Sequence, residues 1–100
     1  MKSKLSSLRK DIDRINIDLL NLLNKRIKTA MKIGVIKARN GLPVSDMARE
    51  REIIHSLVLR NEGPIDTKGL KAIFKSVIRE TKRIERITHR EQDFTAGQKS

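Results

Sequence analysis

Apolar residues recur at helical spacing along three segments, which are separated by "NGLP" at 40–43 and "EGP" at 62–64. The first segment runs from about Leu5 to Arg39 and contains no Pro and no Gly except Gly34. Read in heptads, it has two core rows in which eight of ten positions are aliphatic: Leu5, Ile12, Leu19, Arg26, Ile33 and Leu8, Ile15, Leu22, Thr29, Ile36. This pattern predicts one long helix.

The other two segments are shorter and also read as helices. The second begins with Ser45 or Asp46 as a plausible N-cap and ends at Gly63-Pro64, with one apolar face formed by Met47, Ile54, Leu57 and Val58. The third begins near Asp66, and its stripe consists of Leu70, Ile73, Phe74, Val77, Ile78, Thr81, Ile84 and Glu85. Residues 91–100, "EQDFTAGQKS", have no period and are predicted to be a flexible tail after a helical domain at 1–90. No strand pattern occurs, so the expected fold is all-α.

The first helix is too long for a compact monomer. About 35 residues at roughly 1.5 Å each make it about 50 Å long. A globular chain of this size has a radius of gyration of only about 13 Å. The two shorter helices cannot cover so long an apolar stripe, whereas an antiparallel second copy can. The sequence therefore predicts an intertwined homodimer.

Composition narrows the possible functions. The chain of 100 residues has the length of one domain, no apolar run long enough to span a membrane, and a charged start unlike a secretory signal, so we expect a cytoplasmic protein. It has no Cys, and its two His lack matching carboxylate spacing, so no metal site is expected. The net charge of +11 favours an anionic partner: nucleic acid, acidic lipid or an anionic metabolite.

Three ionisable residues interrupt the predicted apolar faces. Arg26 occupies a heptad core position, and Lys37 follows eleven residues later, about 16 Å along the same face. Glu85 extends the stripe of the third helix one turn beyond Thr81. Each residue could lie at the edge of an apolar stripe, extend its side chain so that the charge reaches water, or form an internal salt bridge. Together with the charged start of the second helix, they also suit a site for a small dianion.

Arg9 lies 17 residues before Arg26, or about 25 Å along the same helix, so the two cannot share a small site within one chain. In an antiparallel dimer centred near residue 20 or 21, position 9 falls opposite about position 32. That position lies between Arg26 and Lys37. The Arg9 side chain of a second copy can therefore complete the cationic cluster.

Three stretches carry a family resemblance: "LRKDIDRINIDLLNLLNKRIKTAMKIGVIK", "PVSDMAREREI" and "IFKSVIRETKRIE". They resemble the all-helical (AroQ-type) chorismate mutases over about residues 5–88. The resemblance implies a dimer of three-helix protomers that rearranges chorismate to prephenate in phenylalanine and tyrosine biosynthesis.

The resemblance also implies roles for individual residues. Arg9 of the other subunit and Arg26 would each bind one substrate carboxylate, and Lys37 would bind the ether oxygen and a carboxylate. Arg49 would support the carboxylate end, while Glu50 and the Asp46 backbone would hold the ring hydroxyl. Thr81 stands where the family often has Ser, and Glu85 where many bacterial members have Gln. An ether oxygen only accepts hydrogen bonds, so Glu85 must be protonated to donate one.

The chemistry agrees with the composition. A unimolecular Claisen rearrangement needs no nucleophile, metal or redox cofactor. It is helped by fixing the reactive conformer and by stabilising negative charge on the breaking C–O bond. Arginine suits the two carboxylates because its planar guanidinium binds both oxygens of each.

Other functions remain as alternatives. The nearest is isochorismate pyruvate lyase on the same scaffold, although the pattern of Asp46 and Glu50 favours the mutase. A small nucleic-acid-binding protein is suggested by the charge and by "RETKRIERITHR", whose basic side chains would lie away from the apolar stripe: Arg79, Lys82, Arg83 and Arg86. No helix-turn-helix or zinc pattern supports it. A non-catalytic coiled-coil adaptor would not explain why Arg26 occupies a heptad core position.

Overall fold

The protein consists of three α-helices in the computed structural model, which describes residues 2–99 and side chains up to Gln92. The helices are α1 (Lys2–Arg39), α2 (Met47–Arg60) and α3 (Thr67–Lys99). No strand occurs within residues 2–99. The predicted all-α fold and its three helical segments are confirmed.

The end of α1 is fixed by a glycine turn. Gly41 has a φ of +64°, a left-handed conformation that glycine adopts without a steric penalty. The Leu42 N–H donates to the Lys37 carbonyl at 2.8 Å, and the Gly41 N–H donates to the Ala38 carbonyl at 3.3 Å. This pair of bonds is a Schellman motif, which ends a helix and redirects the chain. It turns residues 42–46 back toward α1 and α3.

Aspartate caps begin the other two helices. Asp46 Oδ1 accepts a hydrogen bond from the Arg49 N–H at 3.0 Å, and Asp66 Oδ1 accepts one from the Gly69 N–H at 2.7 Å. Each carboxylate thereby satisfies an amide that has no partner inside its helix. Of the two N-caps considered for the second segment, Asp46 is the one used.

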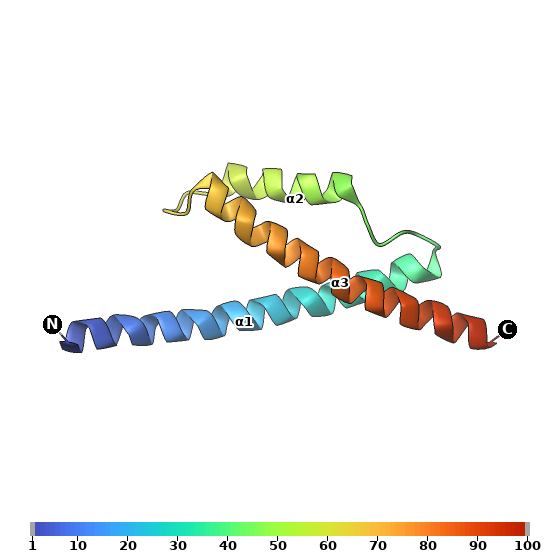
Figure 1. The fold of residues 1–100 in the computed structure, drawn as a ribbon, viewed down its shortest axis with the longest axis horizontal. Helices are drawn as coiled ribbons and strands as arrows, with labels where there is room; N and C mark the ends of the chain where they lie inside the picture. Colours follow the sequence, from blue (N-terminus) through green and yellow to red (C-terminus); the bar gives the residue numbers. More distant parts are fainter. Residues whose placement is uncertain (1, 100) are drawn as a thin grey trace.

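Helix α3 forms the centre of the fold because it contacts both other helices. Figure 1 shows α2 lying along the first half of α3, while the second half of α3 crosses the C-terminal half of α1. The most buried side chains are at these two contacts: Ala30, Leu70, Ile78, Thr81, Glu85 and Thr88. The predicted stripe of α3 is therefore largely correct, although Ile73 remains 54% exposed.

Gly34 allows α1 to approach α3 closely. A Cβ atom at position 34 would lie 3.3 Å from the backbone oxygen of Glu85 and 3.4 Å from Thr88 Cβ. A glycine inside a helix costs up to about 1 kcal/mol relative to alanine, so this position favours close packing over helix propensity. The approach brings Lys37, one turn later, against α3.

We expect Gly34→Leu to destabilise the protein by about 2 kcal/mol, because the larger side chain must push α1 away from the α3 backbone. Urea unfolding followed by circular dichroism measures this change. Lys28→Leu, at an exposed position of the same helix, is the control and should leave the free energy of unfolding nearly unchanged. An equal loss in the free energy of unfolding in both variants would show that close packing at Gly34 is not the cause of the destabilisation.

The N-terminal half of α1 extends away from the other helices, as Figure 1 shows. Six aliphatic side chains of its predicted stripe are half exposed or more: Leu5, Leu8, Ile12, Ile15, Leu19 and Leu22. The radius of gyration is 18.1 Å, compared with about 13 Å for a globular chain of this length. One chain alone does not bury this stripe.

Residues 91–100 were predicted to be a flexible tail, and α3 continues through this segment to Lys99. Ser100 lies outside the described residues. Residues 91–96 contain no proline or glycine, and Glu91, Gln92 and Ala96 are good helix formers, so no helix breaker occurs before Gly97. Among the described helices, none is long and apolar enough to cross a membrane.

Candidate functional site

A cavity of about 80 Å³ lies where the second half of α1, the loop after it, the start of α2 and the middle of α3 meet. Its lining is mostly polar and charged: Arg26, Lys37, Val44, Asp46, Arg49, Glu50, Ile53, Ile78, Thr81, Lys82 and Glu85. Seven of the eight residues predicted from the sequence to bind substrate are in this set. Residues far apart in the sequence are thus brought to one place.

Arg26 is held by Thr81 across the contact between α1 and α3. Its guanidinium donates a hydrogen bond to Thr81 Oγ1. The Thr81 hydroxyl donates its own proton to the Val77 carbonyl at 2.7 Å, so its oxygen is left to accept from Arg26. The predicted core arginine therefore has a partner, while most of its donors remain available to a ligand.

Lys37 connects three parts of the site. Its Nζ donates to Glu85 Oε1 at 3.1 Å and to the Val44 carbonyl at 2.9 Å. The Lys37 and Glu85 side chains are only 20% and 11% exposed, so their ion pair is largely shielded from water. An ammonium group has three N–H donors, and one of them remains for a ligand.

Asp46 and Arg49 lie at the entrance to α2. The Asp46 carboxylate caps the helix and the Asp46 carbonyl accepts from the Glu50 N–H at 3.0 Å, so the Asp46 N–H is the backbone group left to face a ligand in the described structure. The Arg49 side chain is 60% exposed and pairs with Glu52 on the outside of the helix. Exposed ion pairs of this kind contribute little to stability, so the guanidinium can exchange Glu52 for an anionic ligand at small cost.

Glu50 is paired on one side only. Its Oε1 accepts from Lys82 Nζ at 2.8 Å, and both side chains are 21% exposed. Glu50 Oε2 is buried and has no hydrogen-bond partner within the described structure. A buried acceptor without a partner is costly, which is typical of an atom reserved for a ligand.

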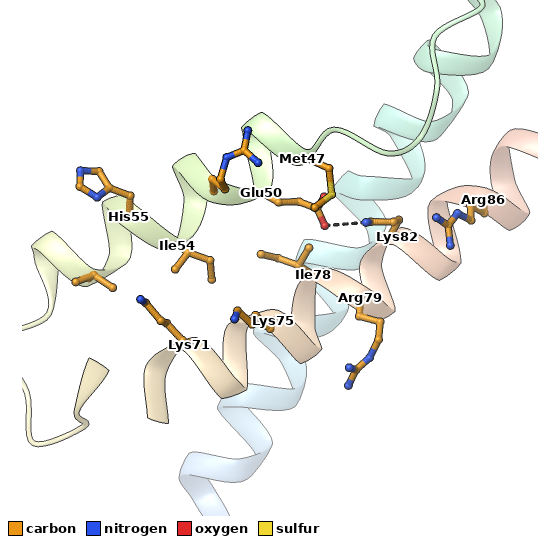
Figure 2. Close-up of a pocket in the computed structure, with 12 residues that line it drawn as sticks. Met47, Glu50, Ile54, His55, Lys71, Lys75, Ile78, Arg79, Lys82 and Arg86 are labelled. Atoms are coloured by element: carbon orange, nitrogen blue, oxygen red, sulfur yellow. Dashed lines mark ion pairs between the residues drawn. The ribbon is translucent and has the colours of Figure 1, made fainter. Parts of the chain in front are cut away.

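A larger groove of about 680 Å³ adjoins this pair between α2 and α3. Figure 2 shows the Glu50–Lys82 ion pair at one end of it, with Ile54 and Ile78 between the two helices. The basic residues that line the groove are Arg51, Lys71, Lys75, Arg79, Lys82 and Arg86. Glu50 and Lys82 line both the cavity and the groove and therefore lie at the boundary between them.

Arg9 is the one predicted binding residue that the single chain does not bring to the cavity. It lies in the extended half of α1, which Figure 1 shows far from the other helices. This placement agrees with the distance along one helix, which prevents Arg9 and Arg26 of the same chain from meeting.

Two contributions were missed from the sequence. The Val44 carbonyl, which accepts from Lys37, is a backbone group and leaves no signal in residue types. Lys82 was expected to lie away from the apolar stripe, and this was wrong, because it pairs with Glu50 beside the cavity. A signal was present: Lys82 follows the buried Ile78 by four residues, which places both on one face.

The outer face of α3 carries a separate ion pair. The Arg83 guanidinium, by hydrogen bonding and then by its charge, lowers the pKa of the exposed Glu80 carboxyl, and Glu80 raises the pKa of Arg83 in the same way. Neither residue lines the cavity. Within residues 2–92, no group of three His, Asp or Glu side chains is arranged to hold a metal ion.

Residues 8–86 match the family model described as "Chorismate mutase type II". The chain belongs to this family. The match spans all the cavity residues, from Arg26 on α1 to Glu85 on α3. It also includes Arg9, which the single chain leaves outside the cavity.

Named relatives and solved structures agree with membership of the chorismate mutase family. A chorismate mutase of Methanocaldococcus jannaschii is 33% identical over 88 residues, covering 86% of this chain and 88% of the relative. A solved chorismate mutase structure from Thermus thermophilus (form II) superposes with a TM-score of 0.82 and 31% identity, covering 83% of this chain and 94% of that one.

Some relatives are much longer. A bifunctional chorismate mutase/prephenate dehydratase of Aquifex aeolicus is 39% identical over 79 residues, which are 75% of this chain but 22% of that protein. The chain thus spans about a fifth of the length of the bifunctional relatives. The similarity is to one part of those proteins.

Proposed function

We propose that this protein is a chorismate mutase, which rearranges chorismate to prephenate. The observation that carries the proposal is the convergence of Arg26, Lys37 and Glu85 with Thr81 on one cavity, in a chain of this family. Chorismate carries two carboxylates, an ether oxygen and a ring hydroxyl. The cavity offers cationic donors for the first two and an acceptor for the hydroxyl.

Each part of the substrate has a suitable partner. Arg26 binds one carboxylate, and its hydrogen bond to Thr81 keeps the guanidinium oriented before substrate arrives. Lys37 donates its remaining N–H to the ether oxygen and exchanges its contact with Glu85 for a substrate carboxylate, and Arg49 supports the carboxylate end. The free oxygen of Glu50, with the Asp46 backbone, holds the ring hydroxyl.

Catalysis follows from geometry and charge. The substrate rearranges without a covalent intermediate, so the residues need only hold the reactive conformer and stabilise charge in the transition state. As the C–O bond breaks, negative charge grows on the ether oxygen, where Lys37 and a protonated Glu85 can donate hydrogen bonds. These two groups already lie 3.1 Å apart, which permits both to reach one oxygen atom.

A direct assay tests the proposal. Purified protein is incubated with chorismate, its consumption is followed by absorbance, and the product is identified as prephenate by mass spectrometry and by its acid-catalysed conversion to phenylpyruvate. A parallel incubation with isochorismate tests for release of pyruvate. Conversion of isochorismate with no reaction of chorismate would assign the lyase activity in place of the mutase.

The active form in this proposal is an antiparallel homodimer. The half-exposed aliphatic residues of α1 form a stripe that a second copy of α1 covers. That arrangement also carries Arg9 of the second copy to the space between Arg26 and Lys37. Each of the two equivalent sites then receives one residue from the other subunit.

We expect light scattering to give twice the 11.5 kDa mass of the chain. Ile12→Asp should shift the protein to inactive monomer. In the proposed dimer, burial of each Ile12 side chain contributes about 2 kcal/mol to association, and the dimer contains two of them. Ser7→Asp adds the same charge off the stripe and should remain dimeric. A folded and active monomer of the parent chain would contradict the shared site.

A further inference from the structure

The ion pair between Lys82 and Glu50 is the best-defined polar contact at the site that the proposed chemistry does not use. It joins α2 to α3 at 2.8 Å, with both side chains largely removed from water. Lys82 has no part in the roles that the family resemblance implies. This lysine either only stabilises the contact between the two helices or also contributes to recognition of the substrate.

The two oxygens of Glu50 are in different states. Lys82 Nζ occupies Oε1, whereas Oε2 is buried without a partner in the described structure. A contact that served only to join the helices would not explain why the second oxygen is buried and left unsatisfied. An ammonium bound to one oxygen fixes the carboxylate plane and thereby the direction of the other oxygen.

The alternative partners of Glu50 show why it needs to be held. The other cationic side chains around the same cavity are Arg26, Lys37 and Arg49. A carboxylate released from Lys82 would be attracted to these cations, which the two substrate carboxylates require. Lys82 therefore prevents Glu50 from occupying the anion site, and it offsets the repulsion between Glu50 and an incoming dianion.

We infer that Lys82 is a positioning residue for the ring hydroxyl of the substrate. It holds Glu50 so that Oε2 accepts a hydrogen bond from that hydroxyl, and it keeps the Glu50 carboxylate away from Arg26 and Lys37. Lys82 itself does not touch the reacting atoms. This inference rests on the proposed mutase function and extends it to a residue that determines recognition of the hydroxyl-bearing part of the substrate.

The test compares chorismate with its analogue that lacks the ring hydroxyl, 4-deoxychorismate. For chorismate, we expect Lys82→Met to lower kcat/KM by about tenfold, the size typical of a charged hydrogen bond that loses its geometry. For the deoxy analogue, the same substitution should change kcat/KM by less than about twofold, because there is no hydroxyl to bind. Lys82→Arg keeps a cation and should recover most of the activity with chorismate.

The matched control is Lys75→Met, which removes one positive charge from the adjoining groove at a residue that forms no ion pair in the described part of the chain. It should affect both substrates slightly and equally. Thermal unfolding of each variant reports any loss of folding, and Lys82→Gln replaces Lys82→Met if the latter does not fold.

The outcomes separate the two proposals. Equal losses on both substrates with Lys82→Met, or no loss on either, would overturn the inference while leaving the mutase function intact. A parent protein that does not consume chorismate would overturn the proposed function and this inference with it. A loss confined to chorismate, with recovery in Lys82→Arg, is the result we expect.

Discussion

An Arg26→Ala protein is expected to lose about 4 kcal/mol of transition-state stabilisation, or roughly a thousandfold in kcat/KM. Arg26 lies in a partly buried position at the cavity and donates to Thr81. Its removal leaves a substrate carboxylate without its charged partner in a place where water cannot fully replace it. Steady-state kinetics with chorismate measures the loss.

The same variant allows the shared site to be tested. Arg9→Ala should be nearly inactive as well, because Arg9 of one copy serves the site of the other. When the two inactive proteins are mixed and exchange subunits at random, half of the dimers are mixed. Each mixed dimer contains one site with both arginines, so the mixture should regain about a quarter of the parental activity.

Subunit exchange must be confirmed independently, for example by mass spectrometry of a size-tagged copy. A mixture of Arg26→Ala with a second Arg26→Ala preparation is the control and should regain nothing. If confirmed mixed dimers of Arg9→Ala and Arg26→Ala showed no activity, Arg9 would have to act within its own chain or not at all. The single chain, in which Arg9 lies outside the cavity, makes the first of these impossible without rearrangement.

Features set by local sequence were predictable. The heptad rows of α1 and an N-cap at Ser45 or Asp46 follow from spacing within a few turns. The structure has one continuous helix over those rows and uses Asp46 as the cap. Charged residues on predicted apolar faces also gave a usable signal. Arg26, Lys37 and Glu85 stood out because a buried charge requires a partner, and two of the three partner each other.

Features that depend on the contact between helices were not predictable. The periodicity of α3 places Lys82 on the same face as the buried Ile78, but its pairing with Glu50 depends on how α2 lies on α3, which periodicity does not contain. Arg49 illustrates a competition between partners, since the guanidinium expected to support a substrate carboxylate pairs with Glu52. The continuation of α3 to Lys99 could not be predicted from apolar spacing, because residues 91–100 have no apolar period and a helix can extend without one.

Glu85 should make the activity sensitive to pH. Its side chain is 11% exposed and accepts a hydrogen bond from Lys37. An ionised carboxylate has no proton to donate to the ether oxygen, and it repels the substrate dianion. A hydrogen bond from Glu85 to the ether oxygen therefore requires the carboxyl proton, which becomes scarcer as pH rises.

We therefore expect kcat, which reports the enzyme–substrate complex, to be highest at acidic pH and to fall as pH rises, by up to about tenfold per pH unit for the loss of one required proton. Glu85→Gln supplies a permanent N–H donor of nearly the same shape, so it should flatten this decline and be the more active protein at alkaline pH. Glu80→Gln is the matched control, because it makes the same change on the exposed face of α3 and should keep the parental profile. A parent with no alkaline loss, or a Glu85→Gln variant with the same loss as the parent, would show that Glu85 is not the proton donor.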